Sequence, residues 1–415
     1  MISFKISMKS PSRNLCPACK GYRLLCGRNR CPLLARFELQ RAVISKISIS
    51  FGGSTPPEVL VGSRTWPDVS LSLLAAPTDP MSVEEMGDPE RLYGKSLEEV
   101  INLRSQLLRC EIKLNVKSAK QPPRMLEEIR EAALSICGLS LEVRLKRLPQ
   151  PRMRFDGFLA PTGPSATLEH FTLSENPKVP PRVENLVADT DAKAETSVLE
   201  LYRAGLSSYY LARLLSLGML GRKLERVLVP SRWSITAVDS IISKDLGRRL
   251  IHADTVDTPQ LFTTEYVGNR YAVLLLPSTL FFEMVEIVMP GCVYLPWGTE
   301  PWIGSDSEGW RGKSSYPSIG GGYYAAKLPA YEHLARRGKQ AFVLVVRQVT
   351  PDYWAPVGSW KIREALRHAL SGKPATFSTV SDALAQISEF IRMPLDRWLP
   401  KAKRFLSLQA QQKLN

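Results

Sequence analysis

The sequence has few histidines and no long apolar segment. Its 415 residues contain four histidines, and no two of them stand at metal-ligand spacing: His170, His252, His333 and His368. A catalytic centre built on histidine is therefore not indicated, although Asp and Glu chemistry stays open. The apolar run at 274–282 is too short to span a bilayer and contains Pro277. The N-terminus also lacks the apolar segment of a secretory signal peptide. We therefore expect a soluble, cytoplasmic protein without membrane contact.

Two common phosphate-binding motifs are also missing. Three glycines at 320–322 precede a predicted helix, but they lack the Gly-Lys-Ser/Thr ending of a P-loop and the spacing of a Rossmann fingerprint. The glycines still allow backbone N–H groups to approach an anion, and Tyr323 and Tyr324 offer rings for stacking on bases. A glycine-rich bend packed by aromatic rings is the alternative interpretation.

Positive charge is abundant. The chain has 55 Lys and Arg against 40 Asp and Glu, which gives a net charge of +15. Such an excess favours an anionic partner, most often nucleic acid, although a generally basic protein background would give the same count. The length allows two to three domains with an ample core.

Four cysteines stand within sixteen residues near the N-terminus, in the spacing C-x2-C-x6-C-x4-C: Cys16, Cys19, Cys26 and Cys31. Four thiolates this close can bind one tetrahedral zinc ion, and the segment is too short to fold without it. An iron–sulfur cluster and disulfides are the alternatives. Residues 1–50 carry ten Lys or Arg and one acid, Glu38. The sequence thus predicts a basic zinc knuckle, with Arg28 and Arg30 as phosphate contacts.

Apolar patterning predicts a mixed α/β fold of the α+β class. Helices are expected at 96–110, where Ser96 and Glu99 form a capping box, and at 124–137. The segment 41–51 is expected to be a strand or a short link. We place the knuckle at 1–38, a helix-rich core domain at 39–258, a strand-containing C-terminal α/β domain at 259–400 and an exposed basic tail at 401–415.

The segment 221–240 gathers basic residues before a predicted helix: Arg222, Lys223, Arg226 and Arg232. Ser234 is the expected N-cap. Because a helix N-terminus offers free N–H groups and the positive end of a dipole, the arginines would complete a phosphate site. Ordinary capping beside solvated basic residues is the alternative.

Acidic residues gather at Asp189, Asp191 and Glu195. Closely spaced carboxylates occur in nuclease metal sites, but acids are also expected at the start of a helix. If these residues met the Arg232 segment and the glycine loop in one cleft, an enzyme acting on nucleic acid or a nucleotide would be indicated. The sequence itself establishes no catalytic residue.

Several segments resemble the archaeal NreA family of DNA-repair proteins. The resemblance rests on segments spread over nearly the whole chain: LCPACKGYRLLCGRNRCP, GGSTPPEVLVG, DPERLYGKSLEEV, TGPSA, NPKVPPRVENLVADTDAKAE, GRKLERVLVPSRWSITAVD, EYVGNRYAVLLLP, GGYYAAKL and PLDRWL. It implies a role in DNA repair and a zinc-finger-like N-terminus. Family members often end in a motif that binds the sliding clamp, PCNA. Gln411 and Leu414 match its first half, and its aromatic residues are missing here.

The sequence therefore predicts a DNA-repair protein that binds DNA or repair factors and holds a structural zinc ion. Two other functions stay open. One is an enzyme acting on nucleic acid or a nucleotide, and the other is an adaptor that docks on the sliding clamp through its C-terminal tail.

Overall fold

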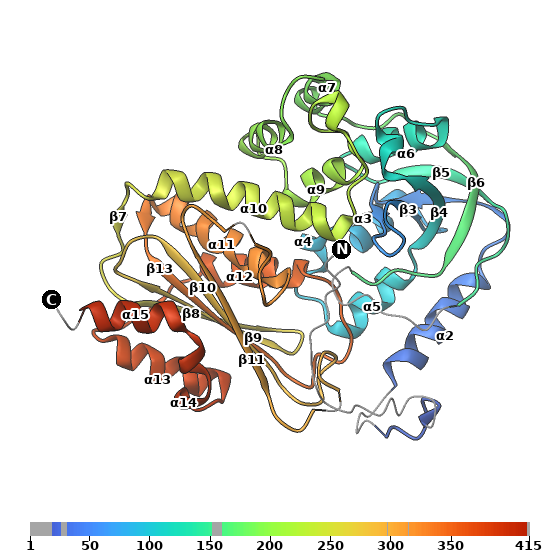
Figure 1. Cartoon of the computed structure of the whole chain (residues 1–415). Coiled ribbons are helices and arrows are strands. Elements are labelled where there is room, and N and C mark those ends of the chain that lie inside the picture. Colours follow the sequence, from blue (N-terminus) through green and yellow to red (C-terminus); the bar gives the residue numbers. More distant parts are fainter. Residues whose placement is uncertain (1–18, 26–30, 152–159, 297, 314, 413–415) are drawn as a thin grey trace.

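The computed structural model describes residues 19–25, 31–151, 160–296, 298–313 and 315–412. Two six-stranded sheets organise these residues, one in the N-terminal half and one in the C-terminal half. Figure 1 shows the first sheet on the right and the second on the lower left, with the long helix α10 (Ser231–Leu250) running above the second sheet.

The first sheet has the order β1-β5-β6-β4-β3-β2. All neighbouring strands are antiparallel except β4 and β6, which are parallel. Alternate residues of β5 face the core, as expected for a strand with one solvated face. The strands are β1 (Ser50–Thr55), β2 (Val59–Val61), β3 (Asp68–Ala75), β4 (Leu108–Asn115), β5 (Leu139–Leu145) and β6 (Ser165–Leu173).

The second sheet has the order β11-β10-β13-β9-β8-β14. The inner strands β10 and β13 are parallel, and every residue of β13 is buried because helices cover both faces. The strands are β8 (Gln260–Tyr266), β9 (Asn269–Leu276), β10 (Phe281–Val288), β11 (Trp302–Gly309), β13 (Phe342–Val349) and β14 (Ala375–Thr376). A separate parallel pair joins β7 (Asp254–Thr255) to β12 (Lys339–Gln340).

Helices on the two faces of the second sheet come from different parts of the chain (Figure 1). One face carries α10, α11 (Gly322–Arg337) and α12 (Trp360–Ser371). The other face packs against α13 (Val380–Ile391), α14 (Leu395–Trp398) and α15 (Lys403–Gln412). The resulting three layers place the start of α12 next to the first half of the molecule.

The remaining helices surround the first sheet and connect it to α10. They are α2 (Pro32–Ile44), α3 (Pro80–Gly87), α4 (Pro89–Leu92), α5 (Leu97–Ser105), α6 (Arg124–Leu134), α7 (Pro181–Ala188), α8 (Ala194–Arg203) and α9 (Ser208–Ser216). Short 3-10 turns lie at Val116–Ala119, Lys223–Glu225 and Leu399–Lys401. None of the helices in the described ranges is long and apolar enough to cross a bilayer.

The mixed α+β class agrees with the sequence prediction, while the predicted domain bounds stay a prediction. The helix expected at 96–110 ends at Ser105, and the residues from Leu108 form β4, because they pair with β3 and β6.

Three further local expectations need correction. The segment 41–51 begins as the end of helix α2, which Pro32 starts, and only its last two residues belong to β1. Helix α10 begins at Ser231, so Ser234 lies inside the helix and its hydroxyl donates to the Ser231 carbonyl.

The predicted exposed tail at 401–415 is the third correction. Residues 403–412 form α15, and Ala402 and Phe405 are buried against the second sheet. The backbone N–H groups of Arg404 and Phe405 donate to the Glu283 carboxylate on β10, at 3.0 and 2.7 Å. The apolar side chains and this cap hold the start of the segment in place, and Lys401, Lys403 and Arg404 are exposed.

Candidate functional site

A cavity of about 470 Å³ lies where the two halves of the molecule meet. Its walls come from α3, α4 and the loop before β2, from the loop 136–138, and from the first turns of α9, α10 and α12. Three segments on which the family resemblance rests contribute side chains to these walls: 52–62, 88–100 and 229–239. The cavity is therefore the place where the most recognisable parts of the sequence converge.

Besides the one-turn helix α4, the helices α9, α10 and α12 begin at this cavity. Ser207 caps α9, and its hydroxyl accepts the N–H of Tyr210 at 3.2 Å. Pro230 precedes α10 and Ser359 precedes α12, and neither contributes a side-chain cap. Gly205, with φ of 89°, makes the turn that brings the start of α9 back toward α10. Because each N-terminus carries the positive end of a helix dipole, the three together favour negative charge in the cavity.

Arg363 is one of two deeply buried arginines on the cavity wall, the other being Arg104. The Arg363 side chain is 1% exposed and forms an ion pair with Asp239 of α10, which is also 1% exposed. The guanidinium stacks on the ring of Tyr209 at 4.6 Å. Burial raises the pKa of Asp239, and the Arg363 guanidinium opposes that shift. Among the described residues, Nε and Nη1 of Arg363 have no hydrogen-bond partner.

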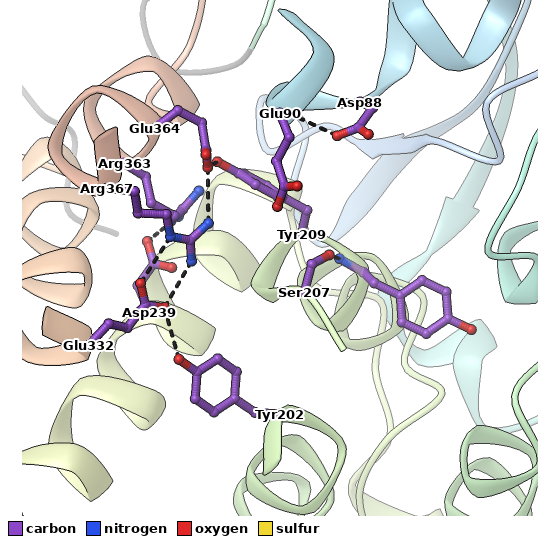
Figure 2. Close-up of polar contacts among 11 residues, drawn as sticks. Asp88, Glu90, Tyr202, Ser207, Tyr209, Asp239, Glu332, Arg363, Glu364 and Arg367 are labelled. Carbon is purple, nitrogen blue, oxygen red and sulfur yellow. Dashed lines mark hydrogen bonds and ion pairs between the residues drawn. The ribbon is translucent and has the colours of Figure 1, made fainter. Parts of the chain in front are cut away.

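A second network behind Arg363 fixes the surrounding helices, as Figure 2 shows. Arg367 of α12 bonds both oxygens of Glu332 on α11, at 2.9 Å each, and Glu364 at 3.0 Å. Tyr202 of α8 donates to Glu332 at 2.9 Å, and Tyr209 of α9 donates to Glu364. These contacts bind four helices together, so the wall that presents Arg363 is rigid.

The carboxylates near the cavity mouth differ in their partners. Glu58 forms an ion pair with Arg104, and Glu84 pairs with Arg91 and accepts the N–H of Gly138. Glu90 on α4 is exposed, and Figure 2 shows it extending toward Tyr209. Partial burial raises the pKa of Glu90, with a further contribution from the nearby Glu364 carboxylate.

The basic residues predicted before α10 divide into two kinds. Arg222, Lys223 and Arg232 are exposed. Arg226 instead donates to three backbone carbonyls, those of Gly221 at 2.8 Å, Val187 at 3.0 Å and Asp189 at 2.6 Å. The structure therefore gives Arg226 a role in joining this segment to the end of α7, whereas the other three face solvent.

Two exposed tryptophans lie beside these basic residues. Trp66, in the loop before β3, is 54% exposed, and Trp233, in the first turn of α10, is 45% exposed. Their ring centroids are 6.2 Å apart. Exposed Arg64 and Arg232 are close neighbours of the two rings in the chain. Sequence reasoning missed this pair because 167 residues separate its members, although two tryptophans next to basic residues were a visible signal.

The cysteine site is only partly covered by the described residues. Cys19 is buried and Cys31 is half-buried, while Cys16, Cys26, Arg28 and Arg30 lie outside the described ranges. Backbone N–H groups, first that of Leu25, hold the pKa of the Cys19 thiol below its ordinary value. A thiolate surrounded by N–H donors fits a zinc ligand. The rest of the described chain offers no group of three or more His, Cys, Asp or Glu placed to hold a metal ion.

Among the described residues, none from the acidic segment 189–195, the glycine loop or the C-terminal segment lines the cavity. The Asp189 carboxylate accepts the N–H groups of Asp191 and Ala192, at 2.8 and 3.0 Å, and so caps a turn. The glycine loop opens α11, and Tyr323 and Tyr324 are buried. Gln411 is exposed near the end of α15, and Leu414 lies outside the described residues, so clamp binding stays a prediction.

Comparison with known proteins places these features in a family context. Residues 25–295 match the family model described as archaeal Nre, N-terminal, and residues 308–415 match archaeal Nre, C-terminal. The chain is 38% identical over 394 residues to the "DNA repair protein NreA" of Archaeoglobus fulgidus, covering 95% of this chain and 97% of that protein.

Two further relatives are similar over most of their length. The "DNA repair protein NreA" of Haloferax volcanii is 34% identical over 356 residues, covering 83% of this chain and 84% of that protein. The "DNA repair protein NreB" of Archaeoglobus fulgidus is 32% identical over 389 residues, covering 93% and 96%. No solved structure matches significantly.

Proposed function

Because the chain belongs to the archaeal Nre family, we propose that it acts in DNA repair by binding DNA that exposes unpaired bases. Its relatives carry the name DNA repair protein. The net charge of +15 supports an anionic partner. The observation that carries the proposal is the exposed pair Trp66 and Trp233 with basic residues around it.

Exposed aromatic rings beside arginines are suited to single strands. Each base has a π-face that stacks on a tryptophan ring, and each stack contributes about 1–3 kcal/mol without reading the sequence. Arg222, Lys223 and Arg232 would neutralise backbone phosphates and release the counterions condensed on them. Because this release gains less entropy at higher salt, the affinity should fall as salt is raised. A duplex hides the faces of its bases, so this surface favours single-stranded or branched DNA.

The test is fluorescence-anisotropy binding to single-stranded, duplex and branched DNA over a salt series. We expect the double variant Trp66→Ala/Trp233→Ala to lose about tenfold or more in affinity for single strands and much less for duplex. Met81→Ala, at an exposed apolar position on α3, is the control and should bind like the unchanged protein. Equal loss on duplex and single strands would argue against base stacking.

We also propose that Cys16, Cys19, Cys26 and Cys31 bind one zinc ion, which would fold the basic N-terminal segment and hold Arg28 and Arg30 near DNA. The lowered pKa of Cys19 supports thiolate ligation. Elemental analysis of the purified protein should give one zinc per chain, and Cys19→Ser should lose it while Cys137→Ser keeps it. Iron with visible absorption would favour the cluster instead, and absence of any metal would contradict both.

A further inference from the structure

The cavity between the two halves contains N–H donors that lack acceptors. Arg363 has two such nitrogens, Nε and Nη1, although its side chain is 1% exposed. Arg213 of α9, also on the wall, has an unpartnered Nε, and Nη2 donates to the Ser135 carbonyl at 2.7 Å. A buried donor without an acceptor costs about 1–3 kcal/mol, so these nitrogens can each take a further acceptor. Oδ1 of Asp239, in the ion pair with Arg363, is likewise without a partner among the described residues, and the Arg213 guanidinium lies over the Tyr210 ring.

Among the described residues, four arginines and four carboxylates line the cavity, so a preference for an anion rests on the arginine nitrogens without acceptors and on the helix N-termini. The salt bridges among the described residues include none for Arg213, and burial lowers the pKa of its guanidinium to about 10. The first turns of α9, α10 and α12 add three positive dipole ends. Glu58 and Glu84, by contrast, already have cationic partners and would not hold a metal ion.

The shape of the cavity limits the size of the ligand. A volume of about 470 Å³ lies within the range of sites for small organic molecules and exceeds what a lone inorganic ion fills. Leu206, Ile235 and Trp360 supply apolar and aromatic surface next to the arginines. A ligand with an anionic end and a flat apolar part would therefore fill both regions.

We propose that this cavity binds the phosphate monoester of a nucleotide, with the phosphate at Arg363, Arg213 and the three helix N-termini. The nucleotide is either free or the phosphorylated end of a DNA strand. The phosphate site does not depend on the tryptophan surface. Only the second source rests on the proposed DNA-binding function.

The first experiment measures binding of deoxyadenosine monophosphate, deoxyadenosine and inorganic phosphate to the full-length protein by calorimetry and thermal shift. The monophosphate should bind and raise the melting temperature, and deoxyadenosine should not. A second arm compares an oligonucleotide carrying a 5′-phosphate with the same strand ending in a hydroxyl. Preference for the phosphorylated strand assigns the site to DNA ends, and equal binding of the two strands assigns it to the free nucleotide.

Variants that remove or add a negative charge at the cavity should change the affinity for the monophosphate in opposite directions. Glu90→Gln removes a negative charge at an exposed position and should tighten monophosphate binding about threefold. Ile136→Glu adds a negative charge at the mouth, where Ile136 is 58% exposed, and should weaken binding by a similar factor. Arg363→Gln should weaken it more than tenfold. Glu85→Gln and Leu148→Glu, at exposed positions that do not line the cavity, are the matched controls.

The outcome that overturns the proposal is clear even if Arg363→Gln does not fold, because Glu90 and Ile136 are exposed. Absence of monophosphate binding, or binding that neither Glu90→Gln nor Ile136→Glu changes, would exclude the cavity as the site. DNA binding through Trp66 and Trp233 would be untouched by that result. Conversely, loss of DNA binding in the tryptophan variant with unchanged monophosphate affinity would leave the cavity proposal standing.

Discussion

Charged residues on the cavity wall and charged residues in the segment before α10 differ in their surroundings. Arg363 is 1% exposed, stacks on Tyr209 and pairs with a buried carboxylate. Arg222, only nine residues before α10, has a side chain that is 48% exposed and a long contact of 3.5 Å to Glu225. Arg222 is a phosphate contact predicted from the sequence, whereas Arg363 is proposed from the structure, and the two guanidinium groups differ in their environment.

The difference decides how each residue can be tested. A buried charge whose partner is removed stays unpaired in a medium of low polarity, so its loss damages the fold before any ligand is considered. An exposed charge contributes little to stability, because water solvates it in either state. Loss of function is therefore direct evidence for the exposed group, whereas the buried group needs variants at neighbouring exposed positions.

The largest effect is expected at the buried ion pair. Asp239→Ala leaves the Arg363 guanidinium without its carboxylate and should lower the free energy of unfolding by about 3–5 kcal/mol. Urea denaturation followed by circular dichroism measures this change. Glu128→Ala is the control, since its partner Arg124 is 87% exposed, and it should change stability by less than about 1 kcal/mol. Similar losses of stability in Asp239→Ala and Glu128→Ala would contradict the expected difference between a buried and an exposed ion pair.

An intermediate effect on stability is expected at Arg226. It lies in the same segment as the exposed Arg222 and Lys223, but its guanidinium donates hydrogen bonds to backbone carbonyls. Arg226→Ala removes three bonds to backbone carbonyls and should cost about 1–3 kcal/mol of stability. Arg226→Lys should not restore it, because an ammonium lacks the planar fork that reaches Gly221, Val187 and Asp189 together. Thermal unfolding of the two variants beside Lys223→Ala is the measurement, and full rescue by lysine would contradict this geometry.

Local signals in the sequence predicted much of the fold. Ser96 and Glu99 predicted a capping box, and both bonds of that box are present at the start of α5. The end of that helix was less predictable: it stops at Ser105, and the apolar residues from Leu108 form β4. An apolar run at a helix end is compatible with either structure, and only pairing with β3 and β6 selects the strand.

The cavity had no local signal of this kind. Arg363 and Asp239 are 124 positions apart and meet only because α10 and α12 lie on one face of the second sheet. Ser207, Ser231 and Ser359 are each ordinary residues at helix starts, and their convergence follows from topology. Arg226 also had no local signal. In the sequence it stands in the same basic segment as Arg222, but its carbonyl partners lie up to 39 positions away.

The smallest effect on stability, and the clearest on DNA, is expected for Arg222→Ala/Lys223→Ala. Both side chains are exposed, so the free energy of unfolding should change by less than about 0.5 kcal/mol. If each contacts one phosphate, the slope of log affinity against log salt should fall by about 2. Arg336→Ala/Lys373→Ala removes the same charge from other exposed positions and should leave the slope unchanged. Equal reductions in the two double variants would mean that net charge alone attracts DNA, and the distinction between this segment and the rest of the surface would fail.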